Sequence, residues 1–506
     1  MMLATILFIP ICAGIVAWAF QYIDRRLPVL VSIVGLAIDF FLVAYFWLTN
    51  GGPGLPGSRF AEFEAPWFAR LGINFHLAVD GVSLILITLT TFLGCIAVLA
   101  TWRETGERIG FFYLCLTWTL AGVLGVFLAF DLFLFYFAWE FMLVPMFFLI
   151  ALWGHEDRFR AGVKFFIFTQ LSGLLMLGAI LGLYLVHGNA TGVYTFDYAD
   201  LMATPLDPRT GQLLVWGFLA AFLVKLPAVS FHTWLPDAHT QAPTAGSIIL
   251  AGLLLKTGAY GILRLAMPLF PAQAQGLSFP LAILGVIGIL YGALLAFAQT
   301  DLKRLVAYTS VSHMGFVLLG LSVGNEIAFQ GAIIQIVAHA LSTGALFFLA
   351  GALQERLGTR DLSRMGGLWS VVPRLGGASM FFALAALGLP GLGNFLGEFF
   401  IVLGAYRVSV ALAAIAALGF IVSTAYSLWM MQRAFFGENT HGWRIPDLSA
   451  REMAIVILMI VPLLWLGFCP QPFLDLARRA SPDAGKGIGR AQTAGPRGPE
   501  GGWRQE

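Results

Sequence analysis

Apolar residues form long, nearly uninterrupted runs along the chain, and short polar segments separate these runs. Most runs are about 20 residues long, which is the length that a helix needs to cross the hydrocarbon core of a membrane. The pattern therefore predicts an all-α polytopic membrane protein with about 14 transmembrane helices. The expected spans are residues 3–20, 29–48, 81–101, 110–129, 131–152, 163–187, 211–230, 244–265, 280–298, 302–322, 326–353, 375–405, 408–432 and 452–471.

The composition supports this prediction. Of the 506 residues, 59% are hydrophobic and 11% are charged, whereas a soluble protein carries about 25% charged residues. So few charges cannot cover the surface of a soluble protein of this length. The formal net charge of +2 is too small to indicate a nucleic-acid partner. We therefore expect contact with the lipid bilayer and no contact with nucleic acid.

The loops differ in their content of basic residues. Loops that follow odd-numbered spans carry sixteen lysine and arginine residues, and loops that follow even-numbered spans carry five. Cytoplasmic loops of membrane proteins are enriched in these residues. We therefore expect the odd-numbered loops to be cytoplasmic. Because an even number of spans returns the chain to its starting side, both termini are expected to face outward.

Two spans contain a Leu-Pro dipeptide, Leu226-Pro227 in the seventh and Leu389-Pro390 in the twelfth. Proline removes a backbone hydrogen bond, so both helices are expected to break inside the membrane. Broken helices at corresponding positions of two repeats are typical of ion-translocating proteins. Because the two spans are five apart, and five is odd, the two repeats would have inverted orientations in the membrane.

These observations divide the chain into five parts. Spans 1–3 occupy residues 1–109, the first five-helix repeat (spans 4–8) occupies 110–265, and the inverted second repeat (spans 9–13) occupies 280–432. The final span covers 452–471 and a tail covers 481–506. The tail is rich in glycine, proline and charged residues, so it is expected to be disordered.

Among the ionisable side chains inside the predicted spans, six on six different helices are candidates for an ion path: Glu140, Lys225, Lys256, His313, His339 and Glu398. An ionisable group at the bilayer centre costs about 2.5–3.5 kcal/mol on insertion scales and usually marks an ion or proton path. At a rise of about 1.5 Å per residue, Glu140 lies about 14 Å, His313 about 16 Å and Lys256 about 18 Å from the start of its helix.

Each of these groups has a simpler interpretation when it is taken alone. A buried histidine can hydrogen-bond two packed helices, and a buried glutamate or lysine can be half of a structural ion pair. Six such groups at similar depth favour a proton relay instead. Burial disfavours the charged form of lysine and glutamate, so both can gain or lose a proton near neutrality.

The chain shows no sequence pattern for a redox cofactor. Its four cysteines, Cys12, Cys95, Cys115 and Cys469, lie in apolar runs, and none forms the CxxC spacing of an iron–sulfur or zinc site. A GxGxxG motif after a strand, typical of dinucleotide binding, is also missing. We therefore expect no cofactor-binding and no metal-binding residues in this chain.

Three stretches resemble the antiporter-like subunits of respiratory complex I: PDAHTQAPTAGSIILAGLLLKTGAYGILR (236–264), AQTDLKRLVAYTSVSHMGF (298–316) and GLPGLGNFLGEF (388–399). The resemblance covers about residues 1–475. Glu398 stands where two of the three sister subunits of this family are expected to carry lysine. The chain also stops short of the long lateral C-terminal helix of one sister subunit. It therefore most resembles the third sister subunit.

The resemblance implies a proton-translocating membrane-arm subunit of NADH:quinone oxidoreductase, in a bacterial inner membrane and with periplasmic termini. NADH, FMN, iron–sulfur clusters and quinone are then expected in partner subunits, where the redox chemistry would occur. The expected neighbours are other membrane-arm subunits of complex I, including sister antiporter-like subunits. In this chain Glu140 would modulate Lys225, and Lys225 would act as a proton switch beside the broken helix.

The resemblance also implies how the relay continues. Lys256 would pass the proton onward through His313 and His339. These histidines would lead to Glu398 in the twelfth span, where the relay in this chain would end.

The segment between the seventh and eighth spans holds further polar residues. By resemblance, Trp234, Asp237, His239 and Pro243 would shape the loop after the break. For His232 and His239 two interpretations remain open, an ordinary polar residue near the surface or a part of the proton entry.

Other functions are compatible with the same motifs. A subunit of a multisubunit sodium/proton antiporter would lack oxidoreductase partners, and a membrane-bound hydrogenase would combine a similar chain with other redox subunits. A scaffold without transport is the simplest alternative, but it does not account for the six ionisable groups. The residues leave the choice between protons and sodium ions open.

Overall fold

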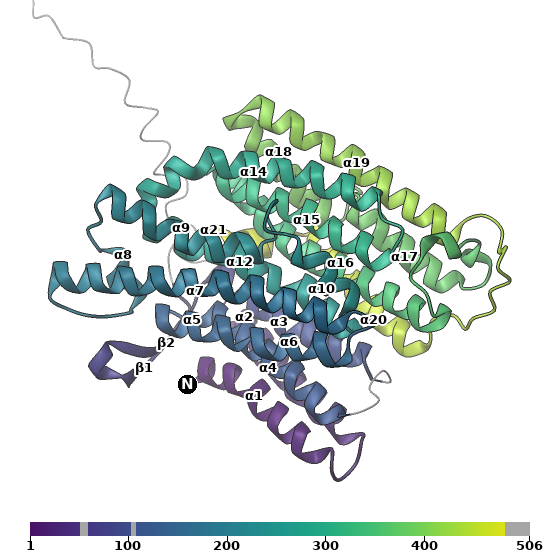
Figure 1. Cartoon of the computed structure of the whole chain (residues 1–506), viewed down its shortest axis with the longest axis horizontal. Helices are drawn as coiled ribbons and strands as arrows, with labels where there is room; N and C mark the ends of the chain where they lie inside the picture. The colour runs from purple at the N-terminus through teal and green to yellow at the C-terminus, as the bar shows by residue number, and fades with distance from the viewer. Residues whose placement is uncertain (51–58, 103–107, 481–506) are drawn as a thin grey trace, which may run out of the picture.

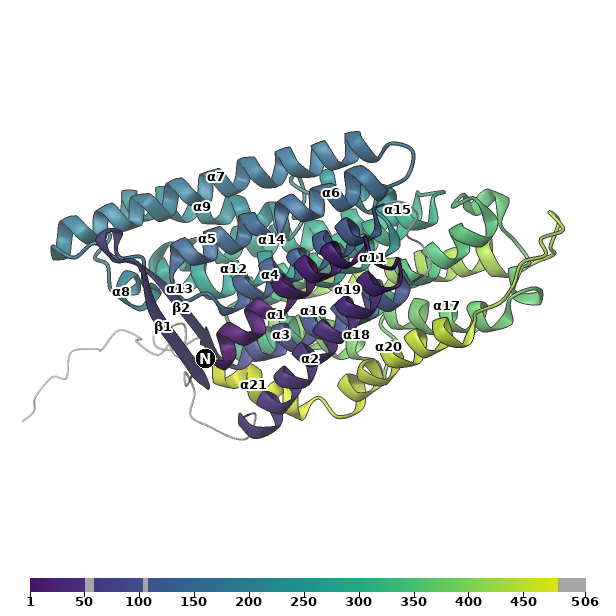
Figure 2. The same cartoon turned by 90° about the horizontal axis from the view of Figure 1, so that it is seen from below.

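Long helices run roughly parallel to one another through the molecule (Figure 1). The computed structural model describes residues 1–50, 59–102 and 108–480. Figures 1 and 2 place the β-hairpin and the short helix α8 at one end of these helices and α17 towards the opposite end. The helix axes therefore define a direction, with loops gathered at its two ends, as a membrane protein requires.

The first part of the chain alternates helices with one antiparallel hairpin. Its elements are α1 (Met2–Phe20), α2 (Leu27–Asn50), β1 (Ala61–Phe68), β2 (Ile73–Val79), α3 (Gly81–Ala100), α4 (Ile109–Leu128), α5 (Leu132–Phe141), α6 (Leu143–Trp153), α7 (Arg158–Thr191), α8 (Tyr198–Met202), α9 (Pro208–Lys225), α10 (Trp234–Gln241), α11 (Thr244–Ile249), α12 (Leu255–Gly261) and α13 (Met267–Leu269). Two π-helical segments, η2 (Leu250–Leu254) and η3 (Ile262–Ala266), join α11, α12 and α13 into one span.

The second part is entirely helical within the described residues. Its elements are α14 (Pro271–Phe297), α15 (Leu302–Ser322), α16 (Glu326–Leu357), α17 (Pro373–Ala386), α18 (Gly393–Val408), α19 (Val410–Phe435), α20 (Ala450–Phe468) and α21 (Gln471–Ala480). Short 3₁₀ turns occur at Ala69–Leu71, Leu362–Arg364 and Leu368–Ser370.

Twelve helices of the described chain are long and apolar enough to cross a membrane, when α5 with α6 and α11 through α13 are each counted as one. The other two predicted spans, the seventh and the twelfth, are broken as expected. Helix α9 ends at Lys225 and helix resumes at Trp234, while α17 ends at Ala386 and α18 begins at Gly393. The prediction of an all-α polytopic membrane protein is confirmed.

Several helices are longer than the apolar runs that predicted them. The sixth span was expected at residues 163–187, and the helix α7 covers Arg158–Thr191. Helix α16 extends to Leu357 and α14 begins at Pro271. Hydropathy detects the part of a helix that lies in hydrocarbon, whereas the helix itself continues into its polar ends, where lysine and arginine are good helix formers.

The hairpin and the last helix were not predicted from the apolar runs. Strands β1 and β2 pair in antiparallel register from Ala61 with Val79 to Phe68 with Ile73. Helix α21 packs against α3 and α16, and Gly81 permits this packing because a Cβ there would clash with the carbonyl of Leu476. The predicted disorder of the tail concerns residues outside the described part of the chain.

The two predicted repeats share a detail at the start of their second helices. Asp131 caps the N-terminus of α5 and forms a β-bridge with Asp197. Asp301 caps α15 in the same way and forms a β-bridge with Asp361. Each bridge ties the helix start to the loop that precedes the broken helix of the same repeat. The same local arrangement therefore occurs once in each predicted repeat.

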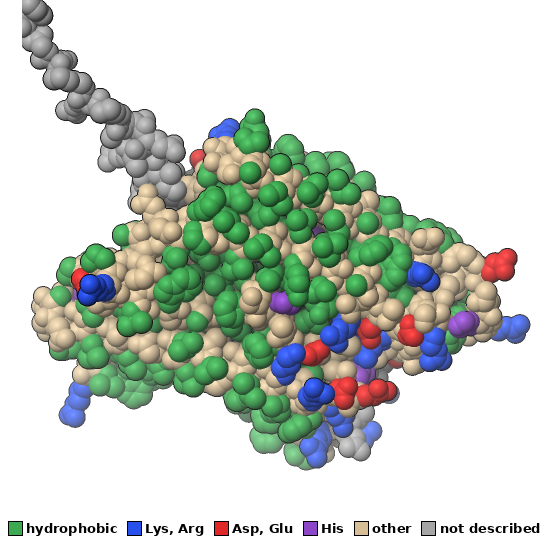
Figure 3. Space-filling model, turned by 45° about the horizontal axis from the view of Figure 1, so that its top comes forward, with side chains coloured by type: hydrophobic (Ala, Val, Ile, Leu, Met, Phe, Trp, Pro, Cys, Tyr) green, Lys and Arg blue, Asp and Glu red, His purple; other side chains and the backbone are tan. Residues whose placement is uncertain are grey.

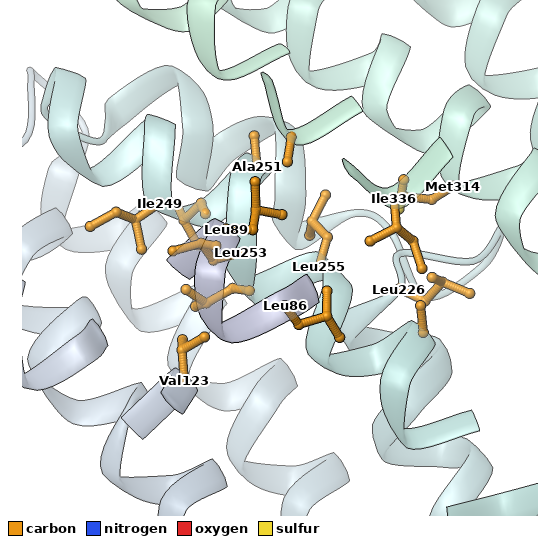
Figure 4. Close-up of a cluster of buried hydrophobic side chains, with 14 of the residues drawn as sticks. Leu86, Leu89, Val123, Leu226, Ile249, Ala251, Leu253, Leu255, Met314 and Ile336 are labelled. Atoms are coloured by element: carbon orange, nitrogen blue, oxygen red, sulfur yellow. The ribbon is translucent and has the colours of Figure 1, made fainter. Parts of the chain in front are cut away.

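Large side chains from both predicted repeats and from α3 pack around the eighth span. Figure 4 shows Leu86 and Leu89 of α3 beside Leu253 and Leu255, with Ile336 of α16 close by, and all of these residues are buried. This packing surrounds the middle of the span with hydrocarbon, where electrostatic interactions are stronger than in water.

Hydrophobic side chains also cover much of the outer surface, as expected for a surface in contact with lipid (Figure 3). Exposed examples lie on α2 (Phe41), α7 (Leu171), α14 (Phe279) and α19 (Ile421). On the face shown in Figure 3, most charged side chains gather towards the end opposite α8. This asymmetry between the two ends matches the uneven distribution of basic residues among the loops.

Candidate functional site

Lys225 is the last residue of α9 and is fully buried. Its Nζ atom lies 5.4 Å from the ring centroids of both Trp139 and Phe165, and it has no hydrogen-bond partner among the described residues. The charge that faces it belongs to Glu140 on α5. A buried ammonium group between two aromatic rings with one carboxylate nearby is held by charge rather than by fixed hydrogen bonds.

Glu140 connects α5 to α7 as well as to Lys225. Its carboxylate interacts with the side chains of Gln170 and Tyr136 as well as with the charge of Lys225. The carboxylate also lies directly against the backbone of α7, because a Cβ at Gly173 would overlap with Oε1 of Glu140. Glu140 and Lys225 therefore form a loosely coordinated pair.

Lys256 is fully buried in α12, between the two π-helical segments. Its Nζ atom donates to the carbonyl oxygen of Ala251, which lies in η2, and lies 2.6 Å from Nδ1 of His339. A π turn shifts carbonyl groups out of the α-helical hydrogen-bond pattern. The segment η2 therefore supplies an acceptor for a lysine that could not otherwise be satisfied within its own helix.

The seventh and eighth spans are in close contact beside the two lysines. A Cβ at Gly258 would lie 2.6 Å from the backbone nitrogen of Leu226 and 2.6 Å from the carbonyl oxygen of Phe222. Only glycine allows this approach. Gly258 follows Lys256 by two residues, and Leu226 directly follows Lys225, so the glycine brings the two lysine-bearing segments together.

His339 and His313 continue the polar path from Lys256. Nδ1 of His339 faces Lys256, and the rings of the two histidines pack edge to face with their centroids 5.4 Å apart. The sequence suggested both residues without their order. The structure places His339 next to Lys256 and His313 next to Glu398.

Glu398 ends this path in α18. Its Oε1 atom lies 2.7 Å from Nδ1 of His313 and accepts a hydrogen bond from Nε2 of Gln335 at 2.7 Å. The hydroxyl group of Tyr426 lies 3.5 Å from Nε2 of His313. All four side chains are buried, so Lys256, His339, His313 and Glu398 form a connected row in the protein interior.

Sequence reasoning missed Gln335, Tyr426 and Asn394. Gln335 and His339 are four residues apart and so lie on one face of α16, which is a signal that the sequence does contain. Asn394 lies one turn before Glu398, is fully buried, and has no partner for either amide atom among the described residues. Neutral amides carry no charge and therefore do not stand out in a search for charged groups in apolar runs.

Several other polar atoms near the row have no hydrogen-bond partner among the described residues. They are Oε1 of Glu140, Nε2 of His339, Oε1 of Gln335, Oε2 of Glu398 and the hydroxyl groups of Ser310, Ser342 and Thr343. Buried polar groups are normally satisfied, and internal water molecules commonly supply the missing bonds. We therefore expect water molecules along this row.

The side chains of His232 and His239 are both buried. Phe231 and Thr233 on either side of His232 are exposed, so both interpretations remain open for His232, whereas His239 is not near the surface. His239 stacks on Phe347 with ring centroids 4.4 Å apart, and neither of its ring nitrogens has a partner among the described residues. It interacts electrostatically with Lys256 and Lys303. His239 therefore lies between the central row and the loop at the end of the bundle where α15 begins.

That loop region is rich in charge. Asp237 pairs with Lys164 at 2.6 Å and with Arg304 at 3.3 Å. His155, in the loop before α7, lies 3.3 Å from Nζ of Lys303. Burial, Lys303 and the nearby Arg360 lower the pKa of His155 to about 4. His155 is therefore neutral at physiological pH and can accept a proton only transiently.

The structure does not gather the cysteines into a cofactor site. Cys12, Cys95 and Cys115 lie on α1, α3 and α4, and Cys469 caps α20. Within the described residues, no group of three His, Cys, Asp or Glu side chains is arranged to hold a metal ion.

A second charged cluster lies at the other end of the bundle, on the hairpin. Nδ1 of His76 lies 2.6 Å from Oδ2 of Asp197, and its Nε2 lies 2.6 Å from Oε1 of Glu62. Two carboxylate neighbours require a proton on both ring nitrogens. Burial alone would lower the pKa of His76, but these two hydrogen bonds and the two negative charges raise it above the ordinary value.

The hairpin is also attached to the start of α5. The amide nitrogen of Asn74 donates to Asp131, and the amide nitrogen of Phe130 donates to the carbonyl of His76. His76 therefore ties the hairpin to the segment that leads into the helix carrying Glu140.

This cluster predicts a pH-dependent attachment of the hairpin. The pKa of His76 is raised in the folded protein. Its contribution to the stability of the hairpin is therefore complete below the unfolded pKa of about 6.5, and this contribution is lost as the pH rises through the raised pKa. Hydrogen exchange of residues 61–79, corrected for its intrinsic pH dependence, should accelerate above that pH. His76→Gln should remove this step, whereas His441→Gln, at an exposed site, should keep it. A step that persists in His76→Gln would refute the assignment.

Comparison with known proteins gives a consistent result. Residues 129–424, more than half of the chain, match the family model described as NADH:quinone oxidoreductase/Mrp antiporter, transmembrane. The chain is 52% identical over 489 residues to NADH-quinone oxidoreductase subunit M of Pseudomonas aeruginosa, covering 94% of this chain and 96% of that protein.

Two solved structures show the same fold. A chain of respiratory complex I from Thermus thermophilus with bound NADH is 32% identical, with a TM-score of 0.84, and the match covers 94% of this chain and 98% of that chain. A chain of the Mrp complex from Dietzia sp. is 25% identical, with a TM-score of 0.82, and the match covers 95% of this chain but 52% of that chain.

Proposed function

Because this chain belongs to the family of NADH-quinone oxidoreductase subunit M, we propose that its buried row of ionisable residues is the path by which it moves protons. The chain is a multi-pass inner-membrane subunit of the membrane arm of this enzyme complex. It lies there with other antiporter-like subunits. The expectation drawn from Glu398, that the chain resembles the third sister subunit, is thereby confirmed.

The observation that carries the proposal is the contact between Lys256 and His339 together with the contact between His313 and Glu398. Both contacts are short, at 2.6 Å and 2.7 Å, and both join helices that are far apart in the sequence. A structural network would close its hydrogen bonds, whereas Lys225, His339 and Glu398 keep nitrogen and oxygen atoms that have no partner among the described residues. Free acceptor and donor positions are what proton transfer requires.

The contacts between these side chains support the following steps. While Glu140 carries a negative charge, it stabilises the protonated Lys225. When Glu140 moves away or is neutralised, Lys225 loses its only nearby anion among the described residues and releases its proton towards Lys256. Lys256 then donates to Nδ1 of His339, and the ring of His313 leads to Oε1 of Glu398. Water molecules complete the path where side chains do not touch.

His239 provides the entry to this path. It is buried, unpartnered, and subject to the charges of both Lys256 and Lys303. A neutral imidazole at this position can accept a proton from the charged loop region and pass it inward, with water molecules bridging the gaps.

NADH oxidation and quinone reduction take place in partner subunits, which hold FMN, the iron–sulfur clusters and the quinone. Within its described residues, this chain has no group of three or more His, Cys, Asp or Glu side chains that could hold a metal ion. It converts a conformational or electrostatic signal from those subunits into proton movement.

The function is tested by NADH-driven ion uptake into inverted membrane vesicles. In a strain whose copy of this subunit is deleted, the wild-type gene should restore acidification of the vesicle interior in sodium-free buffer. Protonophore should abolish the gradient. Uptake that requires sodium ions would instead favour sodium transport. This antiporter alternative has weaker support, because the match to the Mrp structure has lower identity and covers half of that chain.

We further propose that the odd-numbered loops face the cytoplasm and that both termini face the periplasm. The support is the excess of lysine and arginine, sixteen against five, in the loops of one side. One of the sixteen, Arg103, lies outside the described residues.

Single cysteines in a cysteine-free variant test this orientation. A membrane-impermeant thiol reagent added to spheroplasts should label Arg70→Cys but should label Arg25→Cys only after lysis, because both positions are exposed but lie on loops of opposite sides. Labelling of Arg25→Cys in intact spheroplasts would show that the topology is inverted.

We also propose that residues 110–265 and 280–432 are inverted repeats. The two β-bridged aspartate pairs and the two broken helices, each occurring once per repeat, support this division. In such an arrangement the breaks at Lys225 and before Gly393 occupy equivalent positions, and each lies beside one end of the proton path.

A further inference from the structure

Asp39 is an acidic residue in the middle of a membrane span that takes no part in the proposed relay. It lies twelve residues after the start of α2 (Leu27–Asn50), which places it about 18 Å from that end. Its side chain is fully buried, although α2 lies at the periphery, with 33% of its apolar window buried. The carboxyl group therefore points from a peripheral helix into the protein.

Among the described residues, the helices that pack most against α2 offer Asp39 no cation. Helix α2 packs mainly against α1, α3 and α4, and none of these three helices contains a lysine, arginine, histidine, aspartate or glutamate. The titratable residues that they do contain are Cys12, Cys95, Tyr113 and Cys115. Cys95 on α3 is close enough to Asp39 for an electrostatic interaction.

Helix α21 also reaches α2. Its Phe473 contacts Trp47 near the end of α2, with ring centroids 5.4 Å apart. Of the charged residues of α21 whose side chains are described, Asp475 is 47% exposed and Arg478 is 53% exposed. They are therefore oriented towards solvent and do not neutralise Asp39.

An ionised carboxylate at position 39 would be energetically unfavourable. An unpaired charge at the bilayer centre is energetically unfavourable, and neither oxygen of Asp39 has a partner among the described residues. The group avoids this cost when it binds a proton and becomes neutral. Asp39 is therefore a carboxylic acid rather than a carboxylate in the membrane.

A structural role does not explain this acid. A carboxylic acid that holds two helices together would close a hydrogen bond, but neither oxygen of Asp39 has a partner among the described residues. The hydroxyl of Ser32 is buried and unpartnered as well. Ser32 precedes Asp39 by seven residues, so the two side chains lie on one face of α2, two turns apart.

We propose that Asp39 is a proton-binding site, separate from the relay, that exchanges its proton with the membrane face at which α2 begins. Ser32 marks the route, because it lies between that face and Asp39 and its hydroxyl can hold a water molecule. The relay residues lie on α5, α9, α12, α15, α16 and α18, none of which is among the main packing partners of α2. The site therefore adds a titratable centre to spans 1–3.

Infrared spectroscopy of the intact complex in lipid nanodiscs tests this proposal. The spectrum of the wild-type complex minus that of Asp39→Asn should show, at neutral pH, the carbonyl band of one protonated carboxylic acid. The band should persist far above pH 4, where an exposed aspartic acid ionises, and it should shift after transfer to D₂O. Asp39→Glu should move the band without removing it, which identifies the residue even if the asparagine variant assembles poorly.

A matched variant controls for general effects. Asp24 lies in the exposed loop before α2, so the wild-type minus Asp24→Asn difference should show carboxylate bands and no acid band. Carboxylate bands in the Asp39 difference would mean that the group is ionised and would overturn the proposal. An acid band that does not shift during prolonged incubation in D₂O would also overturn it, because the proton would then be sealed rather than exchangeable.

Discussion

Lys225→Ala should lower NADH-driven proton uptake by about tenfold or more while the complex still assembles. A positioned group that takes part in proton transfer contributes on the order of 100-fold or more to its rate, and other steps limit how much of this loss appears in turnover. The alanine side chain removes the buried ammonium group from between Trp139 and Phe165. Glu140 then remains without its charge partner and is expected to bind a proton, which avoids an unpaired buried charge.

Lys225→Arg separates a switch from a structural ion pair. Arginine keeps the positive charge that pairs with Glu140, but it does not release its proton in proteins. A structural pair would therefore be restored by arginine, whereas a proton switch would not. We expect Lys225→Arg to assemble well and to pump about as poorly as Lys225→Ala.

A lysine outside the path serves as the control. Lys164→Ala removes a partly exposed lysine that pairs with Asp237, and proton uptake should remain within about twofold of the wild type, because exposed ion pairs contribute little. Uptake must be compared at equal complex content. Full pumping in the arginine variant would mean that Lys225 serves only to balance the charge of Glu140.

The sequence was sufficient to single out the six ionisable residues of the proposed path, because charged and titratable side chains are conspicuous in apolar runs. Lys225 and Glu398 could also be placed beside helix breaks, since the dipeptides Leu226-Pro227 and Leu389-Pro390 can be read directly from the sequence. Depth in the membrane follows from counting residues along a helix. All three inferences use local information only.

The side chains that each of these residues contacts could not be predicted from the sequence. Lys256 could have met either histidine, and the contact with His339 depends on how α12 and α16 cross. The π-helical segment η2, which supplies the carbonyl of Ala251 to Lys256, has no sequence signal that periodicity would reveal. Such contacts arise from tertiary packing, which overrides local preferences.

The hairpin was missed for a related reason. Strand β1 alternates in burial along its first residues, but Trp67, Phe68 and the neighbouring apolar residues blur the alternation in the sequence. His76 and its carboxylate partners come from β1, β2 and the start of α8, which only the fold brings together. Clusters of this kind join distant segments and cannot be inferred from spacing.

Glu398→Gln should preserve assembly but lower proton uptake by about tenfold, and Glu398→Lys should pump better than the glutamine variant. Glutamine has nearly the same shape, and its carbonyl can still accept the hydrogen bond from Gln335 that Oε1 accepts now. It cannot bind or release a proton, so the row would end at His313. The loss should therefore appear in proton transfer and not in the stability of the complex.

The Glu398→Lys variant is expected to pump protons because neighbouring side chains can supply hydrogen-bond acceptors for the lysine. A lysine ammonium group needs acceptors, and Oε1 of Gln335, which has no partner among the described residues, can turn towards it. Nδ1 of a neutral His313 is a second acceptor at the same place. The lysine can then bind and release a proton as Glu398 does in the wild type. The protonated lysine is positive, whereas the protonated glutamate is neutral.

NADH-driven acidification of vesicles, measured at equal complex content, distinguishes the outcomes. Glu438→Gln, in the loop before α20, serves as the matched control and should pump like the wild type. If Glu398→Gln pumps normally while Glu398→Lys does not, Glu398 is a pairing residue for His313 and the relay ends elsewhere. If both variants assemble but do not pump, position 398 requires a carboxylate. The proton would then leave only when an ionised Glu398 lies beside a protonated His313.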